Sequence, residues 1–285
     1  MELKTWLITG ASSGLGHALA EHVLARGDRA VLTASTTAAT EDLAARHPNT
    51  ALALRLDVTD PQQRADGVAR AVERFGGIDV LVNNAAIDFI GALEEQDEPD
   101  YRRMFEVNFF GAVALTRLVL PGMRARGAGT IVNVSSMDGL ASLPANGYYS
   151  ASKFALEGFT EALWQEIEPL GLRAMLIQPG SFRTGIEKRT RASGAAIADY
   201  AGTAGAFRAV LGALTPDVFP GDPARAAEVV FDVVRSGEPR HWVVLGSDAQ
   251  RRIGIKLDQL RAEFDAGEKT ALSTDFPGSA DNAVL

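Results

Sequence analysis

The eight residues Thr9-Gly10-Ala11-Ser12-Ser13-Gly14-Leu15-Gly16 connect a short apolar run to an amphipathic one, and they decide the fold. Upstream, residues 6–9 are apolar or β-branched and predict a buried strand. Downstream, apolar side chains recur at i, i+3, i+4, i+7 and i+8 from Leu15 to Val23, which predicts one helix face. A glycine-rich turn before a helix can hold a pyrophosphate, because glycine lets backbone amides approach it closely. The spacing is G-x-x-x-G-x-G, and the simpler alternative is a tight turn that needs positive φ.

The alternation of strand and helix continues along the chain. Strand candidates are residues 30–33, 51–56, 80–82, 131–134, 174–177 and 242–245, and helical patterns cover 68–75, 100–126, 148–168 and 223–234. Continuously apolar strands that alternate with helices are typical of a parallel sheet covered on both faces. We therefore expect an α/β fold, a Rossmann-type doubly wound parallel sheet, formed as a single domain over residues 1–285.

Two segments depart from this alternation. Residues 185–221 are rich in Ala, Gly and Thr, and Phe207, Val210, Leu211 and Leu214 lie at helical spacing. We expect an insertion there, with one or two short helices, that folds over the substrate as a lid. The chain after Ala266 is weakly patterned, so we expect a weakly ordered tail over about 266–285.

The composition excludes several kinds of protein. The chain has 285 residues, a formal net charge of −8 and no cysteine. The absence of cysteine excludes disulfides, thiolate nucleophiles and Cys-ligated metals, and the scattered histidines lack metal spacing, so we expect no metal. A negative chain is a poor binder of nucleic-acid phosphates. There is no run of 18 apolar residues and no signal-peptide pattern at the N-terminus, so we expect no membrane span and a cytoplasmic protein.

A tyrosine and a lysine four residues apart form the candidate catalytic pair. Tyr149 and Lys153 share one face of a predicted helix. A phenol has an ordinary pKa near ~10, and a neighbouring ammonium favours the phenolate. We therefore expect Lys153 to lower the pKa of Tyr149, so that the phenol exchanges a proton with a carbonyl or alcohol oxygen. The alternative is a solvent-facing helix pair. The neighbouring phenol, Tyr148, has Ser152 and not a lysine four residues later.

Several motifs together resemble the short-chain dehydrogenase/reductase family over roughly residues 5–185. The turn at residues 9–16 is similar to the family's cofactor loop, and Asn83-Asn84-Ala85-Ala86 resembles its NNAG motif, with alanine in place of glycine. Pro179-Gly180 with Thr184 resembles the element that contacts the nicotinamide end. The chain from Tyr149 onward and the stretch 246–249 look most like the steroid- and retinol-dehydrogenase-like branch.

The resemblance implies roles for individual residues. Ser136, thirteen residues before Tyr149, would hydrogen-bond the substrate oxygen, and Ser135 is its adjacent competitor. Lys153 would also hold the nicotinamide ribose, and Asn108 would shape a helix and hold a water in a proton relay. The implied catalytic set is Asn108, Ser136, Tyr149 and Lys153. The implied cofactor-binding set is Gly10, Ser12, Ser13, Gly14, Leu15, Gly16, Ser35, Thr36, Asp57, Val58, Asn84, Ala85, Ala86, Lys153, Pro179, Gly180 and Thr184.

The residues after the second strand bear on the choice of dinucleotide. An acid there binds the ribose hydroxyls of NAD and repels a 2′-phosphate. Here residues 33–37 are Thr-Ala-Ser-Thr-Thr, and the first acid is Glu41. We therefore expect NADP to be preferred, with Ser35 and Thr36 as hydrogen-bonding groups. In the alternative these two are turn residues and NAD is used as well.

The function that this sequence predicts is an NAD(P)(H)-dependent oxidoreductase that interconverts a carbonyl and a primary or secondary alcohol. The apolar residues of the insertion, with Ile87, Phe89 and Leu143, indicate a hydrophobic small-molecule substrate. The alternative is a dinucleotide-binding sensor or scaffold on the same fold. The resemblance also implies a homodimer or homotetramer, paired through the helix of Tyr149 and the one before it.

Some residues receive no catalytic role. His22 lies on an apolar helix face and is expected to pack in the core. The acidic run from Glu94 to Asp100 is interpreted as a solvated loop and helix start. Trp164 is expected to lie in the core or at a subunit interface.

Overall fold

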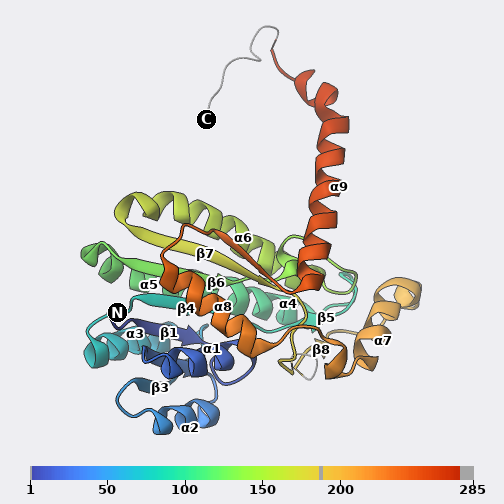
Figure 1. The fold of residues 1–285 in the computed structure, drawn as a ribbon. Coiled ribbons are helices and arrows are strands. Elements are labelled where there is room, and N and C mark those ends of the chain that lie inside the picture. Colours follow the sequence, from blue (N-terminus) through green and yellow to red (C-terminus); the bar gives the residue numbers. More distant parts are fainter. Residues whose placement is uncertain (1, 186–188, 277–285) are drawn as a thin grey trace.

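The structure is a computed structural model that describes residues 2–185 and 189–276. Within these residues seven parallel strands form one sheet in the order β3-β2-β1-β4-β6-β7-β9 (Figure 1). The strands are β1 (Thr5–Thr9), β2 (Arg29–Ala34), β3 (Ala51–Arg55), β4 (Val80–Asn83), β6 (Gly129–Val134), β7 (Leu172–Pro179) and β9 (Trp242–Leu245). The α-helices are α1 (Gly14–Ala25), α2 (Ala38–Arg46), α3 (Pro61–Phe75), α4 (Glu98–Phe105), α5 (Gly111–Arg126), α6 (Gly147–Ile167), α7 (Ala206–Ala213), α8 (Pro223–Ser236) and α9 (Ser247–Leu272).

Two apolar clusters hold the sheet between two layers of helices. On one face α1 and α8 pack on the strands, and Leu19 is buried there. On the other face α3, α5 and α6 pack on the sheet, with Leu115 buried. Successive side chains of a strand point to opposite faces, so Trp6 and Ile8 join the first cluster and Leu7 the second. The strand order reverses between β1 and β4, which opens a crevice at the carboxyl ends of the strands.

The Rossmann-type α/β prediction is confirmed, and each predicted strand agrees with an observed one to within two residues at either end. Helix α3 starts at Pro61, seven residues before the predicted helix, because Asp60 accepts hydrogen bonds from the amides of Gln62 and Gln63. The predicted helix at 100–126 contains a π-helical turn at Glu106–Phe110. Helix α2 was not predicted.

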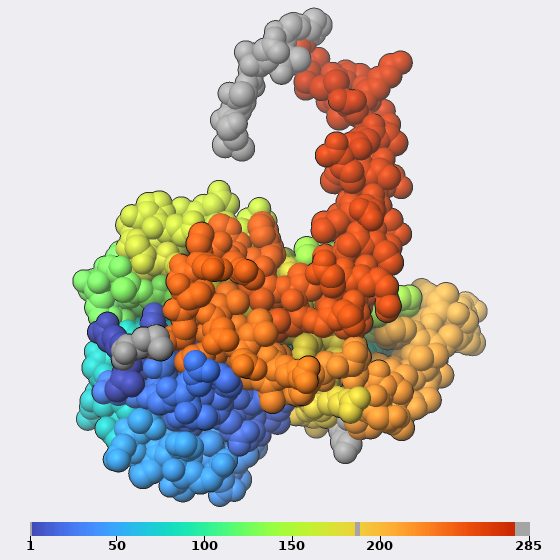
Figure 2. Space-filling model, viewed as in Figure 1, coloured from blue at the N-terminus to red at the C-terminus, as the bar shows by residue number. Residues whose placement is uncertain are grey.

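The end of the chain differs from its prediction. The tail expected from about 266 is wrong for residues 266–272, because α9 continues to Leu272. Apart from Gly267 and Thr270, this stretch consists of Ala, Glu, Lys and Leu, which have high intrinsic helix propensity. Figures 1 and 2 show the outer part of α9 standing clear of the remaining molecule. After four further described residues, positions 277–285 of the expected tail lie outside the described residues.

One helical stretch, Glu98–Arg126, is long and apolar enough to cross a membrane by length and composition alone. In this fold its apolar side chains form part of the core. Leu115, Val119 and Met123 are buried against the sheet in the second cluster. The stretch is therefore explained as a core helix of an α/β domain.

The acidic run is exposed at Glu94, Asp97 and Glu98 and leads into α4, as the sequence predicts, but it is not solvated throughout. Glu95 is buried, and its carboxylate accepts hydrogen bonds from the amides of Ala92 and Ile197 and forms an ion pair with Arg208. Asp100 accepts a hydrogen bond from the hydroxyl of Ser193. These carboxylates bind the insertion, which also adds strand β8 (Arg191–Ala192) to β5 (Phe89–Ile90).

Candidate active site

A cavity of about 680 Å³ opens at the carboxyl edge of the sheet, where the strand order reverses. It receives residues from the strand ends, from α6 and from the insertion. The predicted site residues that line it are Gly10, Ser12, Ser13, Gly14, Leu15, Ser35, Thr36, Asp57, Val58, Asn84, Ala85, Ala86, Ser136, Tyr149, Lys153, Pro179, Gly180 and Thr184. Two predicted residues, Gly16 and Asn108, do not line the cavity. Gly16 packs against Asn84, and Asn108 forms hydrogen bonds with Ile87, and both of these partners line it.

The glycine-rich turn has the shape that a pyrophosphate requires. Gly10 and Gly14 have φ of 66° and 59°, in the left-handed region that favours glycine. A Cβ on Gly16 would meet the side-chain amide of Asn84 and, at 2.7 Å, the carbonyl oxygen of Gly10. Asn84 in turn donates to the carbonyl oxygen of Thr9 at 2.9 Å. Gly16 therefore lets α1 and Asn84 approach each other, so that the free amides at the start of α1 face the cavity.

An arginine that the sequence analysis did not predict lies on this turn. Nη1 of Arg189 donates to the hydroxyl of Ser13 at 2.6 Å, and Nη2 donates to the carbonyl oxygen of Thr184 at 3.3 Å. Ser13 is the N-cap of α1, whose first turn contains no acid. Among the described residues no carboxylate forms an ion pair with Arg189. A guanidinium beside the positive end of a helix dipole is unfavourable alone and favourable when an anion lies between them.

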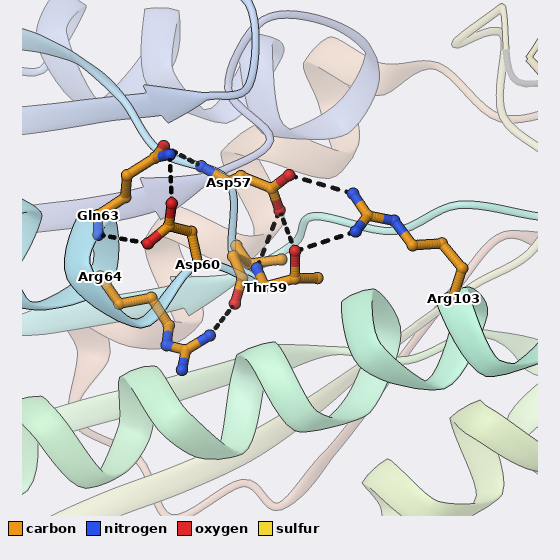
Figure 3. A network of polar contacts seen from close by, with 7 residues as sticks. Asp57, Thr59, Asp60, Gln63, Arg64 and Arg103 are labelled. Atoms are coloured by element: carbon orange, nitrogen blue, oxygen red, sulfur yellow. Dashed lines mark hydrogen bonds and ion pairs between the residues drawn. The ribbon is translucent and has the colours of Figure 1, made fainter.

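The far end of the cavity is built around Asp57, directly after β3. Figure 3 shows Arg103 of α4 reaching toward Asp57 and Thr59. The Asp57 carboxylate accepts from the Thr59 hydroxyl at 2.7 Å and from Arg103 at 3.1 Å. Partial burial favours the neutral carboxyl, but these bonds and the Thr59 amide together hold the pKa of Asp57 below its usual value. Asp57 therefore remains an anion with a fixed orientation.

The candidate catalytic pair lies at the other end of the cavity. The ammonium of Lys153 is 5.7 Å from the centre of the Tyr149 ring and donates to the carbonyl oxygen of Val134 at 2.8 Å. Ser136 begins a short turn after β6, and its hydroxyl accepts a hydrogen bond from the amide of Asp138 at 3.1 Å. A hydrogen bond also links Ser136 to the Tyr149 phenol. The hydroxyl of Ser136 and the phenol of Tyr149 therefore lie side by side in the wall of the cavity.

The expected direction of the Tyr149 pKa shift is wrong in this structure. Burial raises the pKa of the Tyr149 phenol, and the charges of Asp138 and Asp88 raise it further. Burial also lowers the pKa of Lys153 to about 8. The reason is desolvation, which disfavours the charged form of both groups. The spacing of residues along the sequence gives no information on desolvation. At neutral pH the phenol therefore keeps its proton and is equipped to act as an acid.

Asn108 lies in the π-helical turn and is buried. Its side chain accepts from the amide of Ile87 at 2.9 Å, donates to the carbonyl oxygen of Ile87 at 2.9 Å, and donates to the hydroxyl of Ser152. These bonds hold the chain after β4 against α6. Asn108 is thus a positioning residue for the cavity wall, and π-helical turns are often found at such sites.

Two further carboxylates of the cavity were missed. Asp88 follows the Asn-Asn-Ala-Ala motif and accepts from the hydroxyl of Thr190 at 3.1 Å. Burial raises the pKa of Asp88 to about 6. Asp138 forms an ion pair with Arg252 of α9, and Arg252 also donates to the carbonyl oxygen of Ala141. Asp88 could have been noticed in the sequence, because it is an acid within an apolar run. No comparable sequence pattern marks Arg252 or Asp138.

Many of the residues that line the cavity are apolar. They include Ile87, Ile90, Met137, Leu143, Phe207, Leu211, Leu214 and Phe219. Phe89 was expected among them and is absent, because alternation along β5 places Ile90 toward the cavity and Phe89 away from it. Val210 is exposed on α7. His22 packs on Phe231 and Trp164 is buried in the core, as expected.

Comparisons with known proteins agree with this geometry. Residues 4–195 match the family model described as short chain dehydrogenase. The chain is 31% identical over 272 residues to the oxidoreductase BOA17 of Botryotinia fuckeliana, covering 95% of this chain and 99% of that protein. It is 36% identical over 181 residues to the 3-alpha-(or 20-beta)-hydroxysteroid dehydrogenase of Mycobacterium bovis, covering 64% and 70% of the two chains.

Solved structures share the whole fold. A short-chain dehydrogenase from Streptomyces avermitilis superposes with a TM-score of 0.89 at 39% identity, covering 96% of this chain and 99% of that one. A Burkholderia phymatum short chain dehydrogenase/reductase in complex with NAD gives 0.80 at 25% identity, with 92% and 95% covered. A Burkholderia cenocepacia short chain dehydrogenase in complex with NADP gives 0.70 at 25% identity, with 95% and 96% covered.

Proposed function

This chain belongs to the short-chain dehydrogenase/reductase family, and from that premise we propose that it reduces a carbonyl group on a hydrophobic small molecule, with Tyr149 as the acid. Membership makes it an NAD(P)-dependent oxidoreductase that acts on CH–OH groups. The observation that carries the proposal is the Tyr149 phenol beside Ser136, in a partly apolar cavity that the glycine-rich turn also lines.

Each residue of the pair has a defined task in this proposal. Ser136 donates a hydrogen bond to the substrate oxygen and orients the carbonyl toward Tyr149. The bound nicotinamide supplies hydride to the carbonyl carbon. Tyr149 gives its proton to the oxygen, and the ammonium of Lys153 stabilises the phenolate that this leaves. The reverse reaction needs the phenolate first, so the raised pKa of Tyr149 favours reduction at neutral pH.

NADP is the proposed preferred dinucleotide. Ser35 and Thr36 line the cavity after β2, and no acid stands there to repel a 2′-phosphate. Solved relatives contain NAD in one case and NADP in another, so membership supports a nicotinamide dinucleotide of either kind. We expect Ser35→Asp to reverse the preference toward NADH, as measured by the ratio of kcat/KM for the two cofactors. An unchanged ratio would contradict the assignment of Ser35.

A hydrophobic substrate is supported by the apolar lining that α7 and its neighbours contribute. Phe207, Leu211 and Leu214 line the cavity from the insertion, which supports the proposal that the insertion acts as a lid over the substrate. A steroid dehydrogenase among the relatives is consistent with a substrate of this kind.

The decisive experiment follows nicotinamide absorbance with NADPH and with NADH against ketones, aldehydes, quinones and steroid carbonyls. We expect carbonyl-dependent oxidation of the nicotinamide that Tyr149→Phe abolishes. Tyr148→Phe is the matched control, because Tyr148 donates to the carbonyl oxygen of Leu93 and stacks on Tyr101 outside the cavity. Tight dinucleotide binding without turnover in either direction would favour the sensor alternative. Activity in Tyr149→Phe would place the acid elsewhere.

A further inference from the structure

Asp88 is a cavity carboxylate that the proposed mechanism does not use. It lies directly after Ile87, between the end of β4 and β5, and it lines the cavity together with Tyr149. Its Oδ2 accepts a hydrogen bond from the Thr190 hydroxyl at 3.1 Å. Its Oδ1 is buried and has no hydrogen-bond partner among the described residues.

A buried carboxylate with only one of its two oxygens hydrogen-bonded lowers the stability of the fold. Burial disfavours its charge, and an unmet acceptor loses its hydration without replacement. The charge of Lys153 acts on Asp88, but the described cations of the cavity make their hydrogen bonds elsewhere. The ammonium of Lys153 donates to Val134, Arg252 pairs with Asp138, Arg103 with Asp57, and Arg189 donates to Ser13. A neutral side chain such as asparagine could accept the Thr190 hydroxyl equally well. Contact with the lid therefore does not explain why this position carries an acid.

The surroundings of Asp88 define what could meet its free oxygen. Its neighbours on the cavity wall, Ile87 and Ile90, are apolar, and the lid adds the apolar Phe207, Leu211 and Leu214 besides Thr190 and Arg189. Its charge acts on both Tyr149 and Lys153, so it lies close to the point where the carbonyl is reduced. A substrate bound in the cavity can supply a partner for Oδ1 near the reacting carbon.

We propose that Asp88 binds a hydrogen-bond donor of the substrate, a hydroxyl or a protonated amine next to the reacting carbonyl, and that the substrate is apolar beyond that group. This inference rests on the proposed carbonyl reduction and deepens it by naming a substrate class, the α-hydroxy or α-amino carbonyl compound with an apolar remainder. Asp88 exchanges no proton in the reaction. It selects the substrate and sets its orientation, while Tyr149 and Ser136 act on the carbonyl.

The test uses three ketones that share one long alkyl chain and differ only at the α-carbon, which carries hydrogen, hydroxyl or amine. With the native enzyme and NADPH we expect kcat/KM for at least one donor-bearing ketone to exceed that of the plain ketone by roughly 10- to 100-fold, the usual effect of a hydrogen bond to a charged group. Asp88→Asn should reduce that ratio to near one. Preference for the amine indicates a cationic donor, and preference for the hydroxyl a neutral one.

Thr190→Val is the matched control, because it removes the lid hydrogen bond and keeps the carboxylate. It should preserve the ratio between donor-bearing and plain ketones. Binding of the ketones to the Tyr149→Phe enzyme with NADPH, followed by protein fluorescence, should show the same ratio without turnover.

Three results would overturn the inference: equal kcat/KM for all three ketones with the native enzyme, an equal loss on all three with Asp88→Asn, or loss of the ratio in Thr190→Val. Failure of the native enzyme to reduce any carbonyl compound is a different outcome, which would contradict the proposed function itself.

Discussion

Tyr149 lies in surroundings that favour its neutral form. Burial is the main cause, and the carboxylates of Asp138 and Asp88 add to it. Lys153 is near, but its ammonium is also desolvated, and burial lowers its pKa to about 8 even though Glu157, Asp138 and Asp88 oppose this. A neutral phenol beside this ammonium supports the proposed proton donation by Tyr149, followed by stabilisation of the phenolate by Lys153.

The Lys153 ammonium should leave a signature in the pH profile. Its charged form exists below a pKa of about 8, so kcat/KM for carbonyl reduction should fall as pH rises through that value. The measurement is kcat/KM from pH 6 to 10 with a fixed ketone and saturating NADPH. Lys153→Arg keeps its charge throughout this range, so its residual activity should lack the descending limb. The same limb in that variant would assign the titration to another group.

Arg189 should contribute to dinucleotide affinity. It lies on Ser13 at the start of α1, where the pyrophosphate is expected, and no acid neutralises it among the described residues. Arg189→Gln should weaken binding of NADPH and NADH alike, by about tenfold, the loss of one charge-assisted hydrogen bond. Fluorescence titration measures both dissociation constants.

Arg191→Gln is the control for Arg189, because Arg191 is exposed on β8 and outside the cavity lining. A loss confined to NADPH would show that Arg189 binds the 2′-phosphate instead. Unchanged affinity for both cofactors would remove Arg189 from the site.

At the scale of elements, α9 is attached to the active site through its first turns. Arg252 donates to Asp138 and to the carbonyl oxygen of Ala141, and the amide of Asp138 donates to the hydroxyl of Ser136. Ala249 and Ile253 are buried, whereas Leu257 and the residues from 261 to 276 except Gly267 are exposed. The base of the helix therefore supports the turn that carries Ser136, and the remainder makes few contacts.

Removal of the Arg252 charge should destabilise the protein. Arg252→Met leaves the Asp138 carboxylate buried without its cation, which costs about 3 kcal/mol of unfolding free energy at pH 7. Burial already raises the pKa of Asp138, so protonation should relieve part of this loss as pH falls. Urea unfolding at pH 7 and pH 5 measures both effects. Arg251→Met, on the exposed neighbour, should have little effect, and equal losses in both variants would contradict this account.

At the scale of the whole molecule, exposed apolar side chains gather on the helices that precede and contain Tyr149. Phe110 is 50% exposed, Leu118 39% and Phe154 43%. Leu118 lies on α5, Phe110 just before it, and Phe154 on α6. Large apolar side chains exposed on adjoining helices are typical of a protein–protein interface. They support our proposal that the chain forms a homodimer or homotetramer through these two helices.

Light scattering of the full chain tests this proposal. We expect a mass of two or four chains, and the double variant Phe110→Glu with Phe154→Glu should shift it to one chain, because four or more buried carboxylates would oppose assembly. Phe264→Glu on the outer part of α9, where Phe264 is 71% exposed, is the control and should keep the native mass. A monomer made by Phe264→Glu alone would locate the interface on α9.

The order of strands and helices could be predicted from the sequence because their signals are local. The apolar run before Gly10 and the helical period after it identify the first β–α unit, and the later units repeat this pattern. The boundaries of α3 and α9 were less accurate, because a cap at Asp60 and an exposed, weakly amphipathic helix give little periodic signal. The candidate cofactor loop and the Tyr149–Lys153 pair were likewise visible in the sequence, since each is a short motif.

The tertiary structure alone decided which distant residues meet at that site. Arg189 contacts Ser13, Arg252 pairs with Asp138, and the run around Glu95 holds the insertion, across separations of about a hundred residues or more. It also reversed the expected pKa shift of Tyr149, because desolvation depends on what surrounds a group and not on its spacing along the chain. Local periodicity and short motifs therefore determined the fold and the core of the site. The charged residues that shift pKa values in the site are brought together by three-dimensional packing. No pattern in one segment indicates which distant segment will contact it.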